Sequence, residues 1–212
     1  MKTILEKNKE YSENYHQKID KKGLIPEMIK DIINKEEINT IVDLGCGDGE
    51  VIRGILNKYQ DKNVLGIDIS PRRINDLIKE FPKQKFICAD VCNSKLDDNS
   101  IDLAISTQLI EHLEDDVDFV GEIERILKPK GYAFITSVIK KPWAIYKYRN
   151  KGKFVLDPTY VREYKNVDEF LELFKPEFKL IKYKVFPVKR KAFGLSLRIP
   201  GYYIVEALWE KI

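Results

Sequence analysis

The chain has 212 residues, 43% of them hydrophobic and 33% charged, with a formal net charge of +3. That length and composition suit one globular domain over residues 1–212, and the small net charge neither requires nor excludes an anionic partner. No apolar run is long enough to cross a bilayer and the Lys- and Glu-rich start differs from a secretory signal, so we expect a soluble cytoplasmic protein with no membrane association. The three cysteines (Cys46, Cys88 and Cys92) show no C-x-x-C spacing, which fits a reducing cytosol.

Strand-like and helix-like segments alternate between residues 24 and 138. Apolar spacing predicts a helix over residues 24–35. The expected strands are 40–44, 64–67, 85–88, 101–106 and 132–138. The expected helices between them are 51–59, 70–81 and 113–127. Strands that alternate with helices predict parallel pairing, right-handed crossovers and a doubly wound three-layer α/β sandwich.

The two ends of the chain show different patterns. A short helix is expected over 167–174, and residues 178–186 and 202–209 alternate as antiparallel strands do. The basic segment 189–198 between these strands is expected to be a solvated loop. Residues 1–23 contain Tyr11, Tyr15 and His16, and they fit either a lid over a ligand or an ordinary amphipathic helix.

A glycine-rich segment follows the first expected strand. Gly45, Gly47 and Gly49 suit a sharp turn and a close approach of the backbone to a ligand. The dinucleotide-binding pattern G-x-G-x-x-G would need glycine at position 50, where the chain has Glu50. Asp43 just before the glycines would repel a pyrophosphate but suits a ligand that carries an ammonium and a sulfonium. An NAD-dependent oxidoreductase is therefore disfavoured.

Carboxylates also end the second and third expected strands. Asp68 can accept hydrogen bonds from both hydroxyls of a ribose, and Asp90 can accept one from the amine of an adenine. The carboxyl ends of parallel strands lie at one edge of a sheet, so Asp43, Asp68 and Asp90 should converge on one crevice.

Several ordered segments resemble one family. Val42–Glu50, Gly66–Ser70, Cys88–Val91, Ile101–Leu113 and Leu127–Tyr132 are similar to successive motifs of class I S-adenosylmethionine-dependent methyltransferases, in particular the ubiquinone- and menaquinone-pathway type. The resemblance covers about residues 24–138 and implies a mostly parallel seven-stranded sheet with an antiparallel strand at its C-terminal edge. It also implies S-adenosylmethionine as the cofactor.

The resemblance assigns roles within the crevice. It implies that Asp43 and the glycine loop hold the methionine end, Asp68 the ribose, and Asp90 with the backbone of Val91 the adenine. Thr107 and Gln108 would lie near the sulfonium. The predicted cofactor-binding residues are Asp43, Gly45, Cys46, Gly47, Asp68, Ile69, Asp90, Val91, Thr107 and Gln108.

The catalytic residues do not follow from the sequence, and positioning can supply most of the rate acceleration of methyl transfer. Some relatives bind a divalent metal through E-x-x-E-H, but Gln108 replaces the first Glu here, so we expect no metal. We expect Glu111 and His112 to begin the following helix, with His112 beside the pocket. His112 is one candidate base. Tyr160 is another candidate, at a position where relatives often have His.

Residues 140–164 are aromatic and basic, and we expect them to build the acceptor pocket, although a surface excursion fits equally well. The substrate-pocket candidates are Trp143, Tyr146, Tyr160 and Arg162. We favour methylation of an O or N atom of a small molecule, and the oligomeric state does not follow from the sequence. The alternatives are methylation of RNA or protein, indicated by the basic last third, and a non-catalytic cofactor-binding subunit.

Overall fold

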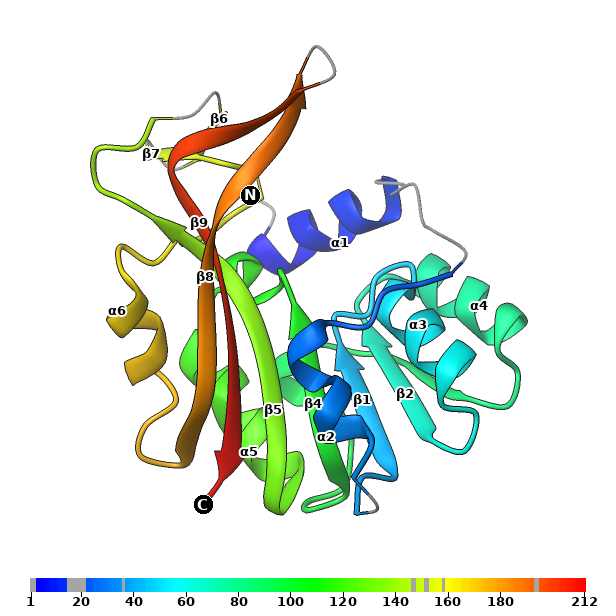
Figure 1. Cartoon of the computed structure of the whole chain (residues 1–212). Coiled ribbons are helices and arrows are strands. Elements are labelled where there is room, and N and C mark those ends of the chain that lie inside the picture. The colour runs from blue at the N-terminus through cyan, green and yellow to red at the C-terminus, as the bar shows by residue number, and fades with distance from the viewer. Residues whose placement is uncertain are drawn as a thin grey trace.

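Seven strands form one sheet in the order β3-β2-β1-β4-β5-β9-β8 in the computed structural model (Figure 1). The structure describes residues 3–14, 22–35, 37–145, 148–150, 153–157, 159–192 and 195–212. The strands are β1 (Thr40–Leu44), β2 (Asn63–Asp68), β3 (Lys85–Cys88), β4 (Ile101–Thr107), β5 (Leu127–Lys140), β8 (Phe178–Ala192) and β9 (Leu195–Lys211). The first five pair in parallel, and β9 runs antiparallel between β5 and β8. The predicted sheet class is confirmed.

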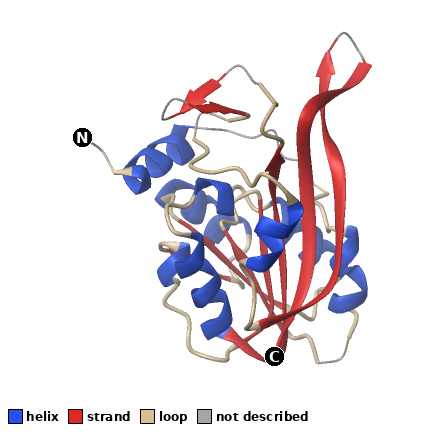
Figure 2. Ribbon diagram, turned by 90° about the vertical axis from the view of Figure 1, so that its left-hand side faces the viewer, coloured by secondary structure: helices blue, strands red, loops and turns tan. Residues whose placement is uncertain are grey.

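Helices cover both faces of this sheet. They are α1 (Ile4–Asn14), α2 (Lys30–Ile33), α3 (Glu50–Lys58), α4 (Pro71–Glu80), α5 (Asp116–Ile126) and α6 (Val167–Glu172). Single 3-10 turns lie at η1 (Glu27–Ile29), η2 (Val91–Asn93) and η3 (Ile110–His112). Figure 2 shows α1 set apart at one end of the strands. A separate two-stranded sheet pairs β6 (Tyr148–Asn150) with β7 (Lys153–Val155).

The alternation of side chains along each strand builds two cores. On β5, Phe134 packs into a cluster with α2, α3 and α4, whereas its neighbour Ile135 faces the cluster that contains α5 and α6. Trp209 of β9 is buried in the second cluster and stacks on Phe174, with 4.0 Å between ring centroids. The strands are therefore covered on both sides, as parallel strands require.

Two predicted helices differ in extent from the structure. Within 24–35, only η1 and α2 are helical, because Pro26 forces the preceding residue into an extended conformation. Leu24 instead donates its N–H to the carbonyl of Glu50, at 3.0 Å, and is exposed. The helix expected from residue 113 begins at Asp116, where the Asp115 carboxylate accepts N–H bonds as its N-cap.

The expected loop at 189–198 is also wrong. Strands β8 and β9 continue through it, with Lys189 opposite Arg198 and Ala192 opposite Leu195. This hairpin lies at the sheet edge and extends beyond the body of the molecule (Figure 1). Lys and Arg are tolerated in an edge strand because their side chains reach water, so a basic composition did not require a loop. Among the described residues, no helix is both long and apolar enough to cross a membrane.

Candidate functional site

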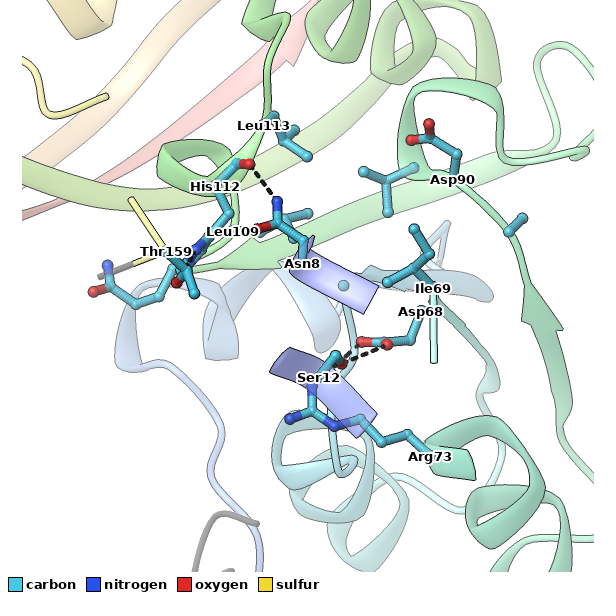
Figure 3. A pocket seen from close by; sticks show the side chains of 14 residues that line it. Asn8, Ser12, Asp68, Ile69, Arg73, Asp90, Leu109, His112, Leu113 and Thr159 are labelled. Carbon is cyan, nitrogen blue, oxygen red and sulfur yellow. Dashed lines mark hydrogen bonds and ion pairs between the residues drawn. The ribbon is translucent and has the colours of Figure 1, made fainter. Parts of the chain in front are cut away.

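A cavity of about 160 Å³ opens at the carboxyl ends of the parallel strands, beneath α1 (Figure 3). This is the edge at which ligands bind in doubly wound sheets. Its lining residues come from α1, the end of β2, the segments that follow β1 to β4, α4, and the loop around residue 159. They are Asn8, Ser12, Gly45, Asp68, Ile69, Arg73, Ala89, Asp90, Val91, Gln108, Leu109, His112, Leu113 and Thr159.

The glycine turn after β1 is held by the second strand. The N–H groups of Gly45 and Cys46 both donate to the carbonyl of Ile67, at 2.8 and 2.9 Å. Gly45 has a φ of +74°, and a Cβ there would lie 2.7 Å from the Leu109 side chain. Only glycine fits this conformation and this space.

Asp68 connects three segments around the cavity. Its Oδ2 accepts the Gly47 N–H at 2.9 Å, and its Oδ1 accepts the Ser70 N–H at 2.9 Å. The Ser12 hydroxyl of α1 lies 3.4 Å from the same Oδ1, a contact visible in Figure 3. The carboxylate therefore orients the glycine turn and the start of α4, and it presents an acceptor to a hydroxyl that enters the cavity.

Asp43 lies buried under this turn, outside the cavity lining. Its Oδ1 has no hydrogen-bond partner among the described residues. Burial raises the pKa of Asp43 to about 7, and the negative charge of Asp68 adds to the rise. The carboxylates of Asp43 and Asp68 influence each other electrostatically, and Oδ1 of Asp43 lacks a hydrogen-bond partner among the described residues. A cationic or N–H-bearing group would suit this site.

The other predicted cofactor residues divide into two groups. Ile69, Asp90 and Val91 line the cavity, and Asp90 also accepts the Cys92 N–H at 3.0 Å as the cap of η2. Cys46, Gly47 and Thr107 are not among its lining residues. Cys46 is buried, and burial raises the pKa of its thiol.

Gln108 belongs to two cavities. Besides the first, it lines a second of about 410 Å³, together with Thr107, Thr136, Phe186 and Glu206. Its φ of +53° is uncommon for a residue with a side chain. The Thr136 hydroxyl holds it there, because it accepts the Gln108 N–H at 3.0 Å and lies 3.3 Å from Nε2. A maintained backbone strain between two cavities is typical of a functional position.

Helix α1 crosses the cavity and is fixed on both sides. Asn8 donates from Nδ2 to the carbonyl of His112 at 2.7 Å (Figure 3). The Glu13 carboxylate accepts the Ser70 hydroxyl at 2.6 Å, and Arg72 donates to the Glu13 carbonyl at 3.1 Å. Asn8 and Ser12 are site residues that were not predicted from the sequence. Their spacing of four residues on one helix face was the available indication.

His112 lies in the turn η3 and not in the following helix. Its Nδ1 lies 2.9 Å from the Thr159 hydroxyl, and its ring meets Tyr160 edge-on at 4.9 Å. Glu111 turns the other way, is fully buried, and accepts the Ser137 hydroxyl at 3.1 Å. Burial raises the pKa of Glu111 to about 8. Within the described ranges, no three His, Cys, Asp or Glu side chains gather as metal ligands would.

The segment 140–164 contributes less to the cavity than expected. Thr159 is its only described residue in the lining, and Tyr160 packs behind it. Trp143 is 63% exposed, and Tyr146 lies outside the described residues. Arg162 points elsewhere, forming an ion pair with Asp116.

Comparison with known proteins finds a family match over part of the chain. Residues 42–135 match the model of a family described as a methyltransferase domain. An uncharacterized protein of Methanocaldococcus jannaschii is 29% identical over 144 residues, covering 68% of this chain and 59% of that protein. The chloroplastic tocopherol O-methyltransferase of Arabidopsis thaliana is 31% identical over 115 residues, covering 51% of this chain and 33% of that protein. The chain thus spans less than two thirds of the length of either curated relative.

Solved structures share the fold. The crystal structure of a SAM-dependent methyltransferase from Methanosarcina mazei matches with a TM-score of 0.67 and 17% identity, covering 90% of this chain and 99% of that one. Residues 42–135 thus match a methyltransferase domain, and the chain shares its sheet architecture with a solved SAM-dependent methyltransferase.

Proposed function

We propose that the protein binds S-adenosylmethionine and transfers its methyl group to an O or N atom of a small molecule. The observation that carries this proposal is the cavity at the strand ends, where Asp68 ends β2 and Asp90 follows β3, beside the glycine turn. When bound, the cofactor supplies a methyl group activated by a positively charged sulfur.

The residues present fit such a cofactor. The unsatisfied Oδ1 of Asp43 favours a ligand with a positive charge or an N–H group, whereas the Asp68 carboxylate already faces Arg73 at 3.8 Å. Asp43, Gly45, Cys46 and Gly47 would hold its methionine end. Asp68 and Ile69 would hold the ribose, Asp90 and Val91 the adenine, and Thr107 with Gln108 would lie near the sulfur. Helix α1 would exclude water from the reacting groups.

A small-molecule acceptor is supported by the second cavity. It shares Gln108 with the first, so an acceptor there would lie next to the proposed methyl position. Its lining includes Leu24, Ile25 and Phe186, which favour an apolar acceptor body. The tocopherol O-methyltransferase relative is named for such a substrate. Tyr160 stays a candidate beside the pocket, and Trp143, Tyr146 and Arg162 stay untested predictions.

An RNA acceptor is a second candidate, because Lys179, Lys182 and Lys184 are exposed along the edge strand β8. Phosphate contacts predict RNA affinity that falls steeply with salt. Affinity that stays flat between low and high salt would dismiss this candidate. Cys46, Cys88 and Cys92 are unpaired in the described chain, which supports a cytoplasmic location.

Calorimetry with S-adenosylmethionine tests the proposal. We expect saturable binding by the wild type and a loss of at least tenfold in affinity for Asp68→Ala, since a buried hydroxyl–carboxylate contact contributes about 1.5–3 kcal/mol. Asp61→Ala is the matched control, because Asp61 is exposed at the opposite end of β2. Thermal unfolding of both variants separates loss of binding from loss of the fold. Absence of binding by the folded wild type would refute the proposal.

A further inference from the structure

A chain of hydrogen bonds reaches from a carboxylate through a hydroxyl to His112. The Thr159 hydroxyl lies 2.5 Å from Oδ1 of Asp157 and 2.9 Å from Nδ1 of His112. The Thr159 N–H also donates to the same Oδ1, at 2.8 Å, which fixes the short turn. The segment is anchored to η3 because the Val161 N–H donates to the carbonyl of Glu111, at 2.8 Å.

This chain determines which ring nitrogen of His112 carries the proton. A hydroxyl has one proton to donate, and a carboxylate can only accept. Thr159 therefore donates to Asp157, and its oxygen can only accept from His112. Nδ1 must then carry the hydrogen, so the neutral ring has its lone pair on Nε2.

The position of the ring suits a proton acceptor. His112 lines the first cavity, and Gln108 lines both this cavity and the second one proposed for the acceptor. Its backbone is held by Leu109 and by Asn8 of α1. Burial lowers the pKa of His112 and so favours the neutral ring, while a hydrogen bond to the Thr159 backbone acts in the opposite direction.

Few charged groups face the ring. Asp157 opposes the lowering of the His112 pKa, because its negative charge favours the imidazolium. Glu111 turns toward Ser137, and α1 contributes the neutral Asn8. Tyr160 contacts the ring edge-on.

We propose that Asp157 and Thr159 are positioning residues that hold His112 in the Nδ1–H form, and that His112 Nε2 is the general base of the methyl transfer. This inference rests on the proposed function and deepens it. The acceptor is then an alcohol or phenol that arrives protonated. Its O–H proton passes to Nε2 as the oxygen bonds to the methyl carbon, and the carbon–sulfur bond breaks with its electron pair left on sulfur.

The tautomer can be measured in the ligand-free protein. The chain has two histidines, His16 and His112, so His16→Gln leaves one imidazole to observe. Long-range proton–nitrogen NMR of that variant, labelled with ¹⁵N-histidine, should show a protonated Nδ1 and an unprotonated Nε2. Adding Thr159→Val should abolish this preference, and Thr159→Ser should restore it. A protonated Nε2 in the His16→Gln protein, or no effect of Thr159→Val, would overturn the positioning role.

Turnover tests the base itself. We expect the protein to transfer radiolabelled methyl from S-adenosylmethionine to members of a panel of simple phenols and alcohols. The rate should rise with pH through the His112 pKa found by NMR, which should lie below 6.5. His112→Asn should lower kcat by roughly 10²–10⁴-fold at saturating cofactor, with cofactor affinity measured in parallel by calorimetry. Unchanged kcat in that variant would overturn the role of His112.

Transfer to carboxylates alone, or to no phenol or alcohol despite cofactor binding, would overturn the acceptor class. Failure of cofactor binding would instead refute the proposed function and leave the NMR result standing.

Discussion

At the scale of single residues, Asp43 makes the stability of the ligand-free protein depend on pH. Its pKa is about 7 in the fold, against about 3.9 in an unfolded chain. Between these two pH values the folded state binds one more proton than the unfolded state. The stabilisation of the fold by this proton is therefore fully present below about pH 4 and is lost as pH rises through 7. From pH 5 to pH 8 this loss should be about 2–3 kcal/mol.

Asp43→Asn should remove that part of the pH dependence. Urea unfolding without ligand measures the free energy of unfolding of the variant and of the wild type at pH 5 and at pH 8. We expect the difference, variant minus wild type, to be more positive at pH 8 than at pH 5. Asp97→Asn is the control, because Asp97 is exposed and should leave the wild-type slope unchanged. The raised pKa of the buried Glu111 makes stability fall with rising pH in all three proteins. Only the difference in pH dependence between the proteins therefore tests Asp43. Equal slopes for the wild type and Asp43→Asn would contradict the prediction.

At the scale of elements, Gly54 of α3 lets the backbone around Leu24 pack closely against this helix. A Cβ at this position would lie 2.6 Å from the backbone carbonyl of Leu24, which belongs to the segment before α2. Replacing a helical glycine by alanine normally stabilises a helix by about 0.5–1 kcal/mol. Here the clash with backbone should reverse the sign, and Gly54→Ala should destabilise the protein by about 1–3 kcal/mol.

Gly121 in α5 provides the matched comparison. A Cβ there would meet nothing within 4 Å, so Gly121→Ala should stabilise the protein by about 0.5–1 kcal/mol. Chemical unfolding of both variants measures the two values. Stabilisation by Gly54→Ala would show that the contact with Leu24 can relax.

Elements with a strong periodic pattern could be predicted from the sequence, and others could not. The strand at Thr40–Leu44 was predicted with its observed bounds because it is an apolar run that ends in glycines. The extent of β8 and β9 could not be predicted. The strand at the sheet edge does not need apolar residues on both of its faces, so its sequence need not show a clear apolar pattern. The 3-10 turn at Ile110–His112 has three residues, too few for a periodic pattern.

At the scale of the whole molecule, the part of the site that follows strand order was predictable. Asp68 is the last residue of β2 and Asp90 lies two residues after the end of β3, so the topology alone places them at one edge. Asn8 could not be predicted in the same way, because it meets His112 across 104 positions of sequence and belongs to no strand. Trp143 was predicted to line the acceptor pocket but is exposed. An aromatic residue in a plausible segment therefore does not by itself indicate a pocket.

The placement of α1 implies that ligand entry requires this helix to move. The cavity holds about 160 Å³, whereas sites for small molecules usually hold about 300–1,000 Å³. Asn8 and Glu13 fix α1 to His112 on one side and to Ser70 on the other. Each such hydrogen bond contributes about 0.5–1.5 kcal/mol. Closure should therefore limit both the entry and the release of S-adenosylmethionine.

The double variant Asn8→Ala/Glu13→Ala should weaken this closure. We expect S-adenosylmethionine to dissociate about tenfold faster and to associate faster as well, because two hydrogen bonds that favour the closed state are lost. Stopped-flow or surface-binding kinetics measure both rates. Lys9→Ala is the control, because Lys9 is exposed on the same helix. Unchanged rates in the double variant would show that α1 does not gate the cavity. Slower association would indicate that α1 guides the ligand inward and does not obstruct it.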